Sequence, residues 1–246
     1  MGLIEKGLEV IYPSNIYCIG CGSVIDKTRY YALCDKCIEK FHWVGKKTCD
    51  KCGKILNEEY SNDLCYDCRM FKHSFEKGYT CVQYGLYERQ LIMDYKNKNK
   101  AYMGKKIGDI LYDRIRLEGV KVHGIIPVPM HRKKQEERGY NQTALMARQL
   151  AKRMELPFLW DVLLRTKYTQ PMKGLGSIQR EENLKDAFEI KLGLSKKIEG
   201  KAILLVDDIY TTGSTMDACS KVLLKSGAEK IIALSFAAGG NRKPAE

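Results

Sequence analysis

ILLVDDIYTTGST, residues 203–215, is the stretch from which the fold of this chain can be predicted. Its first four residues, Ile203–Val206, predict a buried parallel strand, because the run is short, apolar, β-branched at both ends and followed by polar residues. We expect this strand to end at two adjacent carboxylates, Asp207 and Asp208, before a loop rich in Thr and Gly. An amphipathic stretch from Ser214 to Lys225 predicts a helix after the loop. This order indicates an open α/β sheet, in which ligands bind at the carboxyl ends of the strands.

The turn between the predicted strand and helix has the chemistry of a sugar phosphate site. Unpaired backbone N–H groups at the start of a helix favour an anion, typically a phosphate. The neighbouring carboxylates can accept hydrogen bonds from hydroxyls or hold a metal-bound ligand. A phosphoacceptor domain also ends a strand in an Asp pair, but it would carry that pair near its N-terminus and would not continue with TTGST. A P-loop is excluded because no Gly-Lys-Ser/Thr follows, and a Rossmann fingerprint is absent from the sequence.

This arrangement resembles the motif with which type I phosphoribosyltransferases bind phosphoribosyl pyrophosphate (PRPP). The match runs without a gap across Val206, Asp207, Asp208, Thr211, Thr212, Gly213 and Thr215. The resemblance implies that Asp207 and Asp208 are the catalytic acids and contact the ribose 2′- and 3′-hydroxyls. It also implies that the loop from Thr211 to Thr215, which includes Ser214, holds the 5′-phosphate.

Eight of the ten cysteines form a tandem repeat in the N-terminal part of the chain. Each unit has the spacing C-x2-C-x12-C-x2-C, and the second unit follows the first after 31 residues. The first set is Cys18, Cys21, Cys34 and Cys37, and the second set is Cys49, Cys52, Cys65 and Cys68. Four thiolates in two such knuckles suit a tetrahedral Zn²⁺ ion. A unit this short rarely folds without a disulfide or a bound metal, so we expect zinc binding to fold the module.

The assignment of these cysteines to two zinc ions leaves alternatives open. The tandem repeat favours one self-contained ion in each unit, and a cross-braced arrangement that mixes the units is the alternative. Because every position is filled by cysteine, both sites are predicted to be structural rather than catalytic. His42 and His73 lie nearby in the sequence and are interpreted as surplus to the ligand sets. Disulfides are disfavoured, because the first residues do not have the pattern of a secretory signal.

The charge of the chain favours a polyanionic partner. The formal net charge is +12; eight thiolates contribute −8 and two Zn²⁺ ions contribute +4, which leaves about +8. Aromatic and basic residues interleave between Arg29 and Lys51, as in proteins that bind single-stranded nucleic acid. The alternative is that these rings fill a small core while the lysines face solvent. No run of 18 apolar residues is present, which predicts a cytoplasmic protein without a membrane span.

We expect the chain to divide into a zinc-binding module, residues 1–75, an α/β domain of the phosphoribosyltransferase type, residues 76–240, and a disordered tail, residues 241–246. The hydrophobic patterns predict strands at 79–86, 122–128, 158–164, 187–190 and 231–236, and helices at 88–96, 103–117 and 142–154, with a further helix starting at Arg180. Asn141 is predicted to cap the helix that begins at Gln142.

Two loops of the α/β domain are predicted to face the ligand. A cationic loop at residues 129–134, which contains Arg132, follows a predicted strand and suits a pyrophosphate. A second loop at residues 173–177 contains two glycines and suits a mobile lid over a reactive sugar. Cys81 and Cys219, the two cysteines outside the repeat, are interpreted as core residues.

Four features together resemble the ComF family of phosphoribosyltransferase-like competence proteins. They are the cysteine-rich module, PVP followed by a basic loop and RGYNQ, LLRTKYTQ with REENLKDAF, and VDDIYTTGST. Tyr140 stands where the family usually has Phe, Lys167 stands where it often has Arg, and many members have a single zinc quartet. The resemblance implies that PRPP binds with Mg²⁺ and that Arg132 and nearby cations meet its pyrophosphate. It also implies a role in natural transformation, on incoming single-stranded DNA in the cytosol and together with other DNA-uptake proteins.

Three functions are compatible with these features. The first is a PRPP-binding, zinc-containing protein that handles single-stranded DNA during DNA uptake. The second is a phosphoribosyltransferase of nucleotide metabolism that joins PRPP to a small acceptor and releases pyrophosphate. The third is a scaffold without catalysis, whose zinc module docks other proteins. The motif contains no obvious general base and the sequence contains no recognisable pocket for a purine or pyrimidine ring, so the acceptor is not identified.

Overall fold

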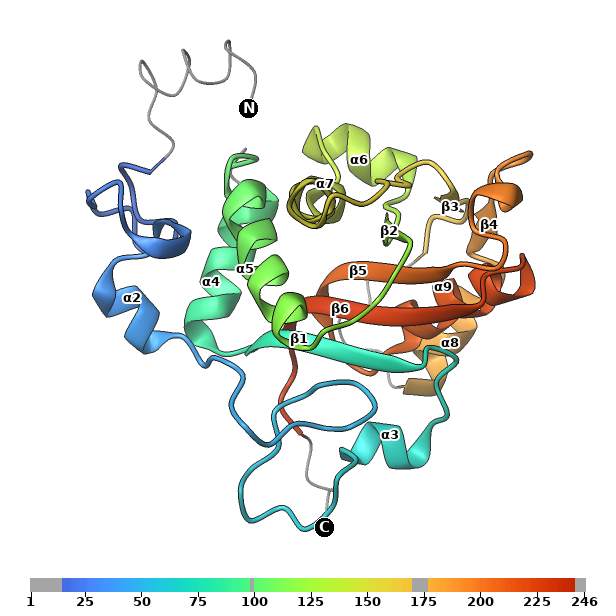
Figure 1. The fold of residues 1–246 in the computed structure, drawn as a ribbon, viewed down its shortest axis with the longest axis horizontal. Helices are drawn as coiled ribbons and strands as arrows, with labels where there is room; N and C mark the ends of the chain where they lie inside the picture. The colour runs from blue at the N-terminus through green and yellow to red at the C-terminus, as the bar shows by residue number, and fades with distance from the viewer. Residues whose placement is uncertain (1–14, 98–99, 170–176, 242–246) are drawn as a thin grey trace.

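A four-stranded parallel sheet forms the centre of the molecule (Figure 1). The computed structural model describes residues 15–97, 100–169 and 177–241. The strand order is β1-β6-β5-β2, and every neighbouring pair is parallel. The strands are β1 (Lys77–Gln83), β2 (Gly124–Pro127), β5 (Ala202–Tyr210) and β6 (Lys230–Ala238). Their apolar side chains are buried almost throughout, as expected when both faces of a parallel sheet are covered.

Alternate residues of β5 divide the core between the two faces of the sheet. Leu204 and Val206 belong to a cluster with α4, α5 and α7, and Ile203 and Leu205 belong to a second cluster with α8 and α9. These helices are α4 (Leu86–Asn97), α5 (Met103–Leu117), α7 (Gln142–Met154), α8 (Ser177–Leu184) and α9 (Ser214–Lys225). Successive side chains of a strand point to opposite faces, so a strand covered on both sides needs a continuous apolar run.

Three shorter elements complete the α/β part. Helix α6 (Arg132–Arg138) lies between β2 and α7 in the chain. Strands β3 (Leu163–Arg165) and β4 (Phe188–Ile190) pair with each other in an antiparallel ribbon outside the central sheet. A short 3-10 helix, η2 (Ser195–Lys197), leads into β5.

The two cysteine units pack against opposite faces of the sheet. The first unit contains η1 (Tyr30–Ala32) and α2 (Asp35–Lys40), and its buried residues join the cluster of α4, α5 and α7. The second unit contains α3 (Tyr66–Met70), and its buried residues join the cluster of α8 and α9. Figure 1 shows α2 beside α4, and α3 on the other side of β1. The two halves of one sequence repeat therefore support different halves of the domain.

The aromatic residues of the first unit mostly belong to its core. Phe41 is buried, and Trp43 donates its indole N–H to the backbone carbonyl of Ile38 over 2.8 Å. Tyr31 packs against the core cluster, whereas Tyr30 is exposed. The rings therefore follow the core alternative rather than forming an open row of stacking platforms.

Most of the long helices begin and end where the sequence predicts. The helices predicted at 103–117, 142–154 and 214–225 have those bounds, and the helix predicted at 88–96 is slightly longer at both ends. Oδ1 of Asn141 accepts the N–H groups of Thr143 and Ala144 at 3.0 and 3.3 Å, which confirms the predicted cap. Cys81 and Cys219 are buried, as predicted. The predicted fold class, a parallel sheet flanked by helices and preceded by a cysteine-rich module, is confirmed.

The predicted end of the central strand is wrong. β5 continues through Asp207 and Asp208 to Tyr210, because β6 pairs with it as far as Ala238. The two acids therefore stand inside the strand and not in the loop that follows. Their backbone is held by the sheet, and their side chains leave the strand in opposite directions.

Other boundaries also differ from the prediction: β1 runs from Lys77 to Gln83 rather than over 79–86, and β6 runs from Lys230 to Ala238 rather than over 231–236. The cationic loop expected at 129–134 becomes helix α6 from Arg132 onward, with His131 as its cap. The strand expected at 158–164 yields one bridge to β2 and then β3, which lies outside the central sheet. Helix α8 begins at Ser177, before the predicted start at Arg180.

Some predictions fall on residues that the structure does not describe. They include most of the expected lid at 173–177, the first fourteen residues, and residues 242–246 of the expected tail. Asn241, the first residue of that expected tail, accepts the backbone N–H of Tyr66 at 3.0 Å. Within the described ranges, no helix combines the length and apolar character that crossing a membrane requires.

Candidate functional site

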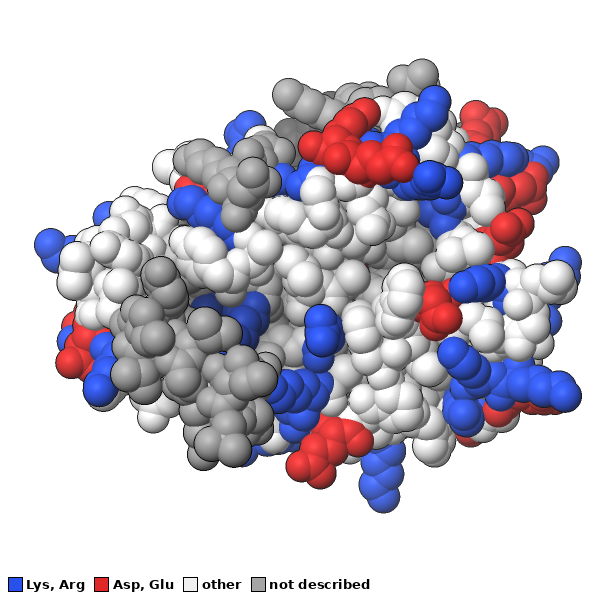
Figure 2. Space-filling model, turned by 90° about the horizontal axis from the view of Figure 1, so that it is seen from above, with Lys and Arg blue, Asp and Glu red and all other residues white. Residues whose placement is uncertain are grey.

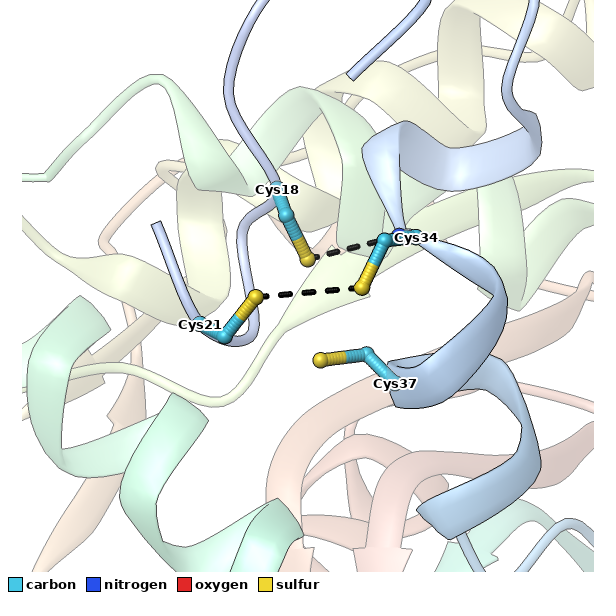
Figure 3. Close-up of side chains that lie close together, drawn as sticks. All are labelled: Cys18, Cys21, Cys34 and Cys37. Carbon is cyan, nitrogen blue, oxygen red and sulfur yellow. Dashed lines mark hydrogen bonds between the residues drawn. The ribbon is translucent and has the colours of Figure 1, made fainter. Parts of the chain in front are cut away.

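The four cysteines of the first unit converge on one point (Figure 3). Their sulfur atoms all lie within 4.8 Å of one another, and those of Cys21 and Cys34 are 3.7 Å apart. A tetrahedral ion with Zn–S bonds of about 2.3 Å separates its sulfurs by about 3.8 Å, so the geometry fits zinc. The Ser23 hydroxyl lies 3.0 Å from Sγ of Cys21 and lowers the pKa of that thiol to about 6, toward the thiolate that binds metal.

The cysteines of the second unit form an equivalent group. Cys49, Cys52, Cys65 and Cys68 also place their sulfurs within 4.8 Å of one another, and those of Cys52 and Cys65 are 3.6 Å apart. Three of the four are almost inaccessible to solvent, in contrast to the exposed Cys21 of the first group. The two groups agree with the tandem assignment and not with the cross-braced alternative. Among the described residues neither His42 nor His73 belongs to a group.

Asp208 is held by two side chains from other elements. Nζ of Lys96, on α4, lies 2.6 Å from Oδ2 of Asp208, and Nε2 of Gln142, on α7, donates to the same oxygen over 3.0 Å. Gln142 is itself held, because Arg138 donates to its Oε1 over 2.8 Å and the Tyr95 hydroxyl donates to its backbone carbonyl over 2.6 Å. The acid is therefore fixed by a network that spans α4, α6 and α7.

The two acids of the pair have opposite pKa shifts. Burial and the charge of Asp208 raise the pKa of Asp207 to about 8. Burial also acts to raise the pKa of Asp208, but the Lys96 ammonium and the hydrogen bonds from Lys96 and Gln142 outweigh it and lower that pKa. Near neutral pH the pair therefore holds one proton, on Asp207, and one negative charge, on Asp208.

A group of cations lies near the acid pair: the charge of Arg165 acts on Asp207, Lys134 lies close to Arg165, and Arg138 lies close to Lys134 and to Gln142. Burial and the neighbouring charges of Arg165 and Arg138 lower the pKa of Lys134. Burial also lowers the pKa of Arg165, and the Nε of this side chain is buried with no hydrogen-bond partner in the described part of the chain. Like charges gathered in a partly buried place repel one another, so this group suits a polyanionic ligand.

Arg132, the cation that the sequence singled out, lies on the outer side of α6. Its side chain is 90% exposed and pairs with Glu136 at 2.8 Å. Lys134 and Arg138, on the same helix, are partly buried instead. Lys134 lies near the charges of Arg165 and Arg138, and Arg138 donates a hydrogen bond to Gln142.

The loop from Thr211 to Thr215 joins β5 to α9 through a left-handed glycine. Gly213 has φ +86°, and a Cβ there would overlap the Tyr210 hydroxyl and lie 2.8 Å from Cε1 of His73. The hydroxyls of Thr212 and Ser214 are 2.9 Å apart. Only glycine fits at this position, for both conformational and steric reasons. The first backbone N–H groups of α9 follow it, and N–H groups at the start of a helix favour an anion.

A cavity of about 890 Å³ lies beside this loop, between α9, β4 and residues 70–73. Thr212, Ser214 and Asp217 line one part of it, whereas the acid pair is not among its described lining residues. Its lining includes four lysines and four carboxylates, so net charge does not select a ligand for it. The cavity and the acid pair are therefore separate: the loop from Thr211 to Thr215 borders the cavity, and the acid pair precedes that loop in the chain.

Sequence reasoning did not name Lys96, Gln142 or Arg165 as site residues. Arg165 directly follows a predicted strand, and Gln142 closes the RGYNQ segment, so position alone was a usable signal for both. Nothing local marks Lys96, which ends a predicted helix among several other lysines. Its role becomes visible only in the fold, where the end of α4 brings Lys96 to Asp208 on β5.

Comparison with known proteins gives two domain families and several relatives that match most of the chain. Residues 7–69 match the double zinc ribbon domain, and residues 142–246 match the phosphoribosyl transferase domain. The chain is 32% identical to Competence protein F of Haemophilus influenzae over 225 residues, which is 88% of this chain and 94% of that protein. It is 25% identical to DNA utilization protein YhgH of Escherichia coli (82% and 88% covered) and 24% identical to Competence protein ComFC of Bacillus subtilis (79% of each).

Proposed function

We propose that this chain, which belongs to the ComF family of phosphoribosyltransferase-like competence proteins, binds PRPP with Mg²⁺ and acts in DNA uptake in the cytoplasm. The names of the relatives, which refer to competence and to DNA utilization, support the second part. The two zinc ions have a structural role in this proposal, because each cysteine group leaves no ligand position for water.

One juxtaposition carries the PRPP assignment: an acid pair, a cation group and a Thr/Gly loop meet at the end of β5. Asp207 and Asp208 would accept the ribose hydroxyls. The loop of Thr211, Thr212, Gly213, Ser214 and Thr215 would hold the 5′-phosphate at the start of α9. Lys134, Arg138, Arg165 and the more exposed Arg132 would meet the pyrophosphate, which brings its Mg²⁺ with it.

The same arrangement suits transfer of the phosphoribosyl group. A nucleophile would form a bond to the anomeric carbon while the bond to pyrophosphate breaks, and the pyrophosphate would leave with the bonding electrons. The partly buried cations would stabilise the negative charge that develops on the leaving group. The acceptor is unassigned, and DNA is either a substrate or a partner in this proposal.

Calorimetry of PRPP with the zinc-loaded protein tests the assignment. We expect binding that requires Mg²⁺ and that is lost when Asp207→Asn and Asp208→Asn are combined. The matched control combines Glu58→Gln with Glu59→Gln, which removes two charges from an exposed turn and should leave affinity unchanged. Absence of binding in a folded, zinc-loaded wild type would favour the scaffold function instead.

Binding of single-stranded DNA is the finer part of the proposal. The net charge, +12 from the sequence and about +8 with both zinc ions bound, supports it, although the face in Figure 2 has its Lys and Arg side chains in several groups with acidic residues between them. Anisotropy of a labelled oligodeoxynucleotide should show affinity that falls steeply with salt, because phosphate contacts release counterions. Undetectable or salt-independent binding would contradict this part. Release of pyrophosphate that depends on a small acceptor, and that Asp208→Asn abolishes, would assign the protein to nucleotide metabolism.

A further inference from the structure

The second cysteine unit contacts the loop from Thr211 to Thr215 through the segment that follows Cys68. Nε2 of His73 lies 3.3 Å from the hydroxyl of Tyr210, and the His73 ring stacks on Phe75 with a centroid distance of 5.0 Å. Both His73 and Tyr210 lie directly against Gly213, where no Cβ fits. The backbone of the loop therefore rests on two rings, and one of them comes from the zinc module.

A second contact ties the same segment to the start of α9. The backbone N–H of Ser74 donates to Oδ1 of Asp217 over 2.6 Å, and Asp217 is buried. The backbone N–H of Asp217 donates in turn to the carbonyl of Gly213 over 2.8 Å. Residues 73 and 74 thus hold both the turn of the loop and the first turn of the helix after it.

The metal-binding part of the second unit is joined firmly to this support. Lys54 and Asp67 form a buried ion pair of 2.5 Å, with side chains 2% and 5% exposed, and the Lys54 ammonium lies 5.6 Å from the centroid of the Tyr210 ring. The knuckle residue Gly53 packs on the backbone of β1, where the Thr80 hydroxyl donates to its carbonyl over 2.6 Å. Movement of the knuckle would therefore displace Tyr210 and β1 together.

The first unit has a different attachment. It lies on the opposite face of the sheet, and the Tyr31 hydroxyl donates to Oδ2 of Asp113 on α5 over 2.8 Å. This contact joins a zinc unit to the domain by one tyrosine hydroxyl, as the Tyr210–His73 contact does, but away from the loop of Thr211 to Thr215. It supplies a chemically matched control.

We propose that zinc in the second unit, and not in the first, sets the conformation of the loop from Thr211 to Thr215, with His73 and Tyr210 as positioning residues. Affinity for the 5′-phosphate of PRPP then depends on the second zinc ion. The dependence of PRPP affinity on zinc rests on the proposed function of the loop. The structural coupling between the second cysteine unit and the loop does not rest on that function. Burial lowers the pKa of His73 and raises that of Tyr210, so both groups are neutral and suited to a hydrogen bond at physiological pH.

The test compares Tyr210→Phe with Tyr31→Phe in the full chain, after zinc content and thermal stability have been measured. Tyr210→Phe should weaken binding of Mg²⁺–PRPP by about five- to tenfold, the value of one hydrogen bond, while Tyr31→Phe should stay within about twofold. His73→Phe should match Tyr210→Phe, and His73→Gln, which keeps a polar nitrogen near the same place, should restore most of the affinity. Equal affinity in Tyr210→Phe and Tyr31→Phe would overturn the proposal.

A second pair of variants tests the metal itself. Cys68→Ser should retain one zinc ion and lose affinity for PRPP. Cys21→Ser should also retain one zinc ion, but its affinity for PRPP should be unchanged. An equal loss in both would contradict the assignment to the second unit. If Cys68→Ser does not fold, the comparison of PRPP affinity between Tyr210→Phe and Tyr31→Phe remains the test.

Hydrogen exchange separates failure of this inference from failure of the proposed function. Without any ligand, backbone amides of residues 211–216 should exchange faster in Tyr210→Phe than in the wild type, and Tyr31→Phe should leave them unchanged. If the wild type binds no PRPP, the proposed function fails. The exchange rates of residues 211–216 then remain as the test of the coupling between the second cysteine unit and the loop. Unchanged rates in Tyr210→Phe would then overturn it.

Discussion

The ammonium of Lys96 lies 2.6 Å from a carboxylate oxygen of Asp208 and joins the end of α4 to the centre of the sheet. The two side chains are only 19% and 11% exposed, so the pair is weakly screened by solvent. The Lys96–Asp208 ion pair explains how one strand tolerates two adjacent acidic side chains. Lys96 stabilises the charge on Asp208, and Asp207 keeps a proton instead.

Removal of Lys96 should destabilise the fold more than removal of a comparable lysine. Lys96→Met leaves the Asp208 charge without its main partner, and we expect a loss of about 2 kcal/mol, reduced from the fully buried case because the pair retains some solvent contact. Lys100→Met is the matched control, because its pair with Asp94 is 3.0 Å long and the lysine is more exposed. That variant should lose about 1 kcal/mol or less. Urea denaturation of both variants measures the difference, and equal losses would contradict this role of Lys96.

The raised pKa of Asp207 should make stability depend on pH. The pKa rises from 3.8 to about 8 on folding, so between these values the folded protein holds a proton that the unfolded chain has released. This contribution to stability is fully present below the unfolded pKa and is lost as pH rises through about 8. Asp207→Asn has no such proton, so its Tm relative to wild type should increase as the pH is raised through this range.

Thermal melts of Asp207→Asn and wild type at a series of pH values from about 6 to about 9 provide the measurement. Glu58→Gln, at an exposed position, is the control and should track the wild type at every pH. Parallel curves for Asp207→Asn and wild type would show that Asp207 is ionised throughout.

Gly213 should tolerate alanine less well than another glycine with the same backbone conformation. Gly213 and Gly139 have φ of +86° and +84°, but a Cβ at Gly139 meets nothing within 4 Å. Gly139→Ala should therefore cost only the left-handed strain of about 1 kcal/mol. Gly213→Ala adds an overlap with Tyr210 and His73, and we expect about 3 kcal/mol. Similar unfolding free energies for the two variants would show that the loop is not tightly supported.

The two cysteine groups should bind zinc with different accessibility. Elemental analysis should find two zinc ions per chain, one for each group. The first group includes an exposed cysteine and the second is mostly buried, so a chelator should remove zinc in a fast and a slow phase. Cys21→Ser should abolish the fast phase and leave the slow one. A single phase that is shared by both ions would contradict this order.

Local features of the chain were predictable because they depend on spacing alone. The C-x2-C knuckles define both the ligands and the metal geometry, and the helix periodicity at 103–117, 142–154 and 214–225 gives the bounds of α5, α7 and α9. The segment around Asp207 likewise predicts a strand, a loop and a helix in the observed order.

The sequence by itself determined the metal ligands, the fold class and the position of the acid pair, since each is encoded by neighbouring residues. The tertiary structure decided where β5 ends, because only β6 supplies its last backbone partners. It also decided that Lys96 holds Asp208, that Arg132 faces solvent, and that His73, in the segment after the second cysteine group, lies against Gly213. These relationships join residues far apart in the chain, and they depend on which surfaces pack together rather than on local spacing.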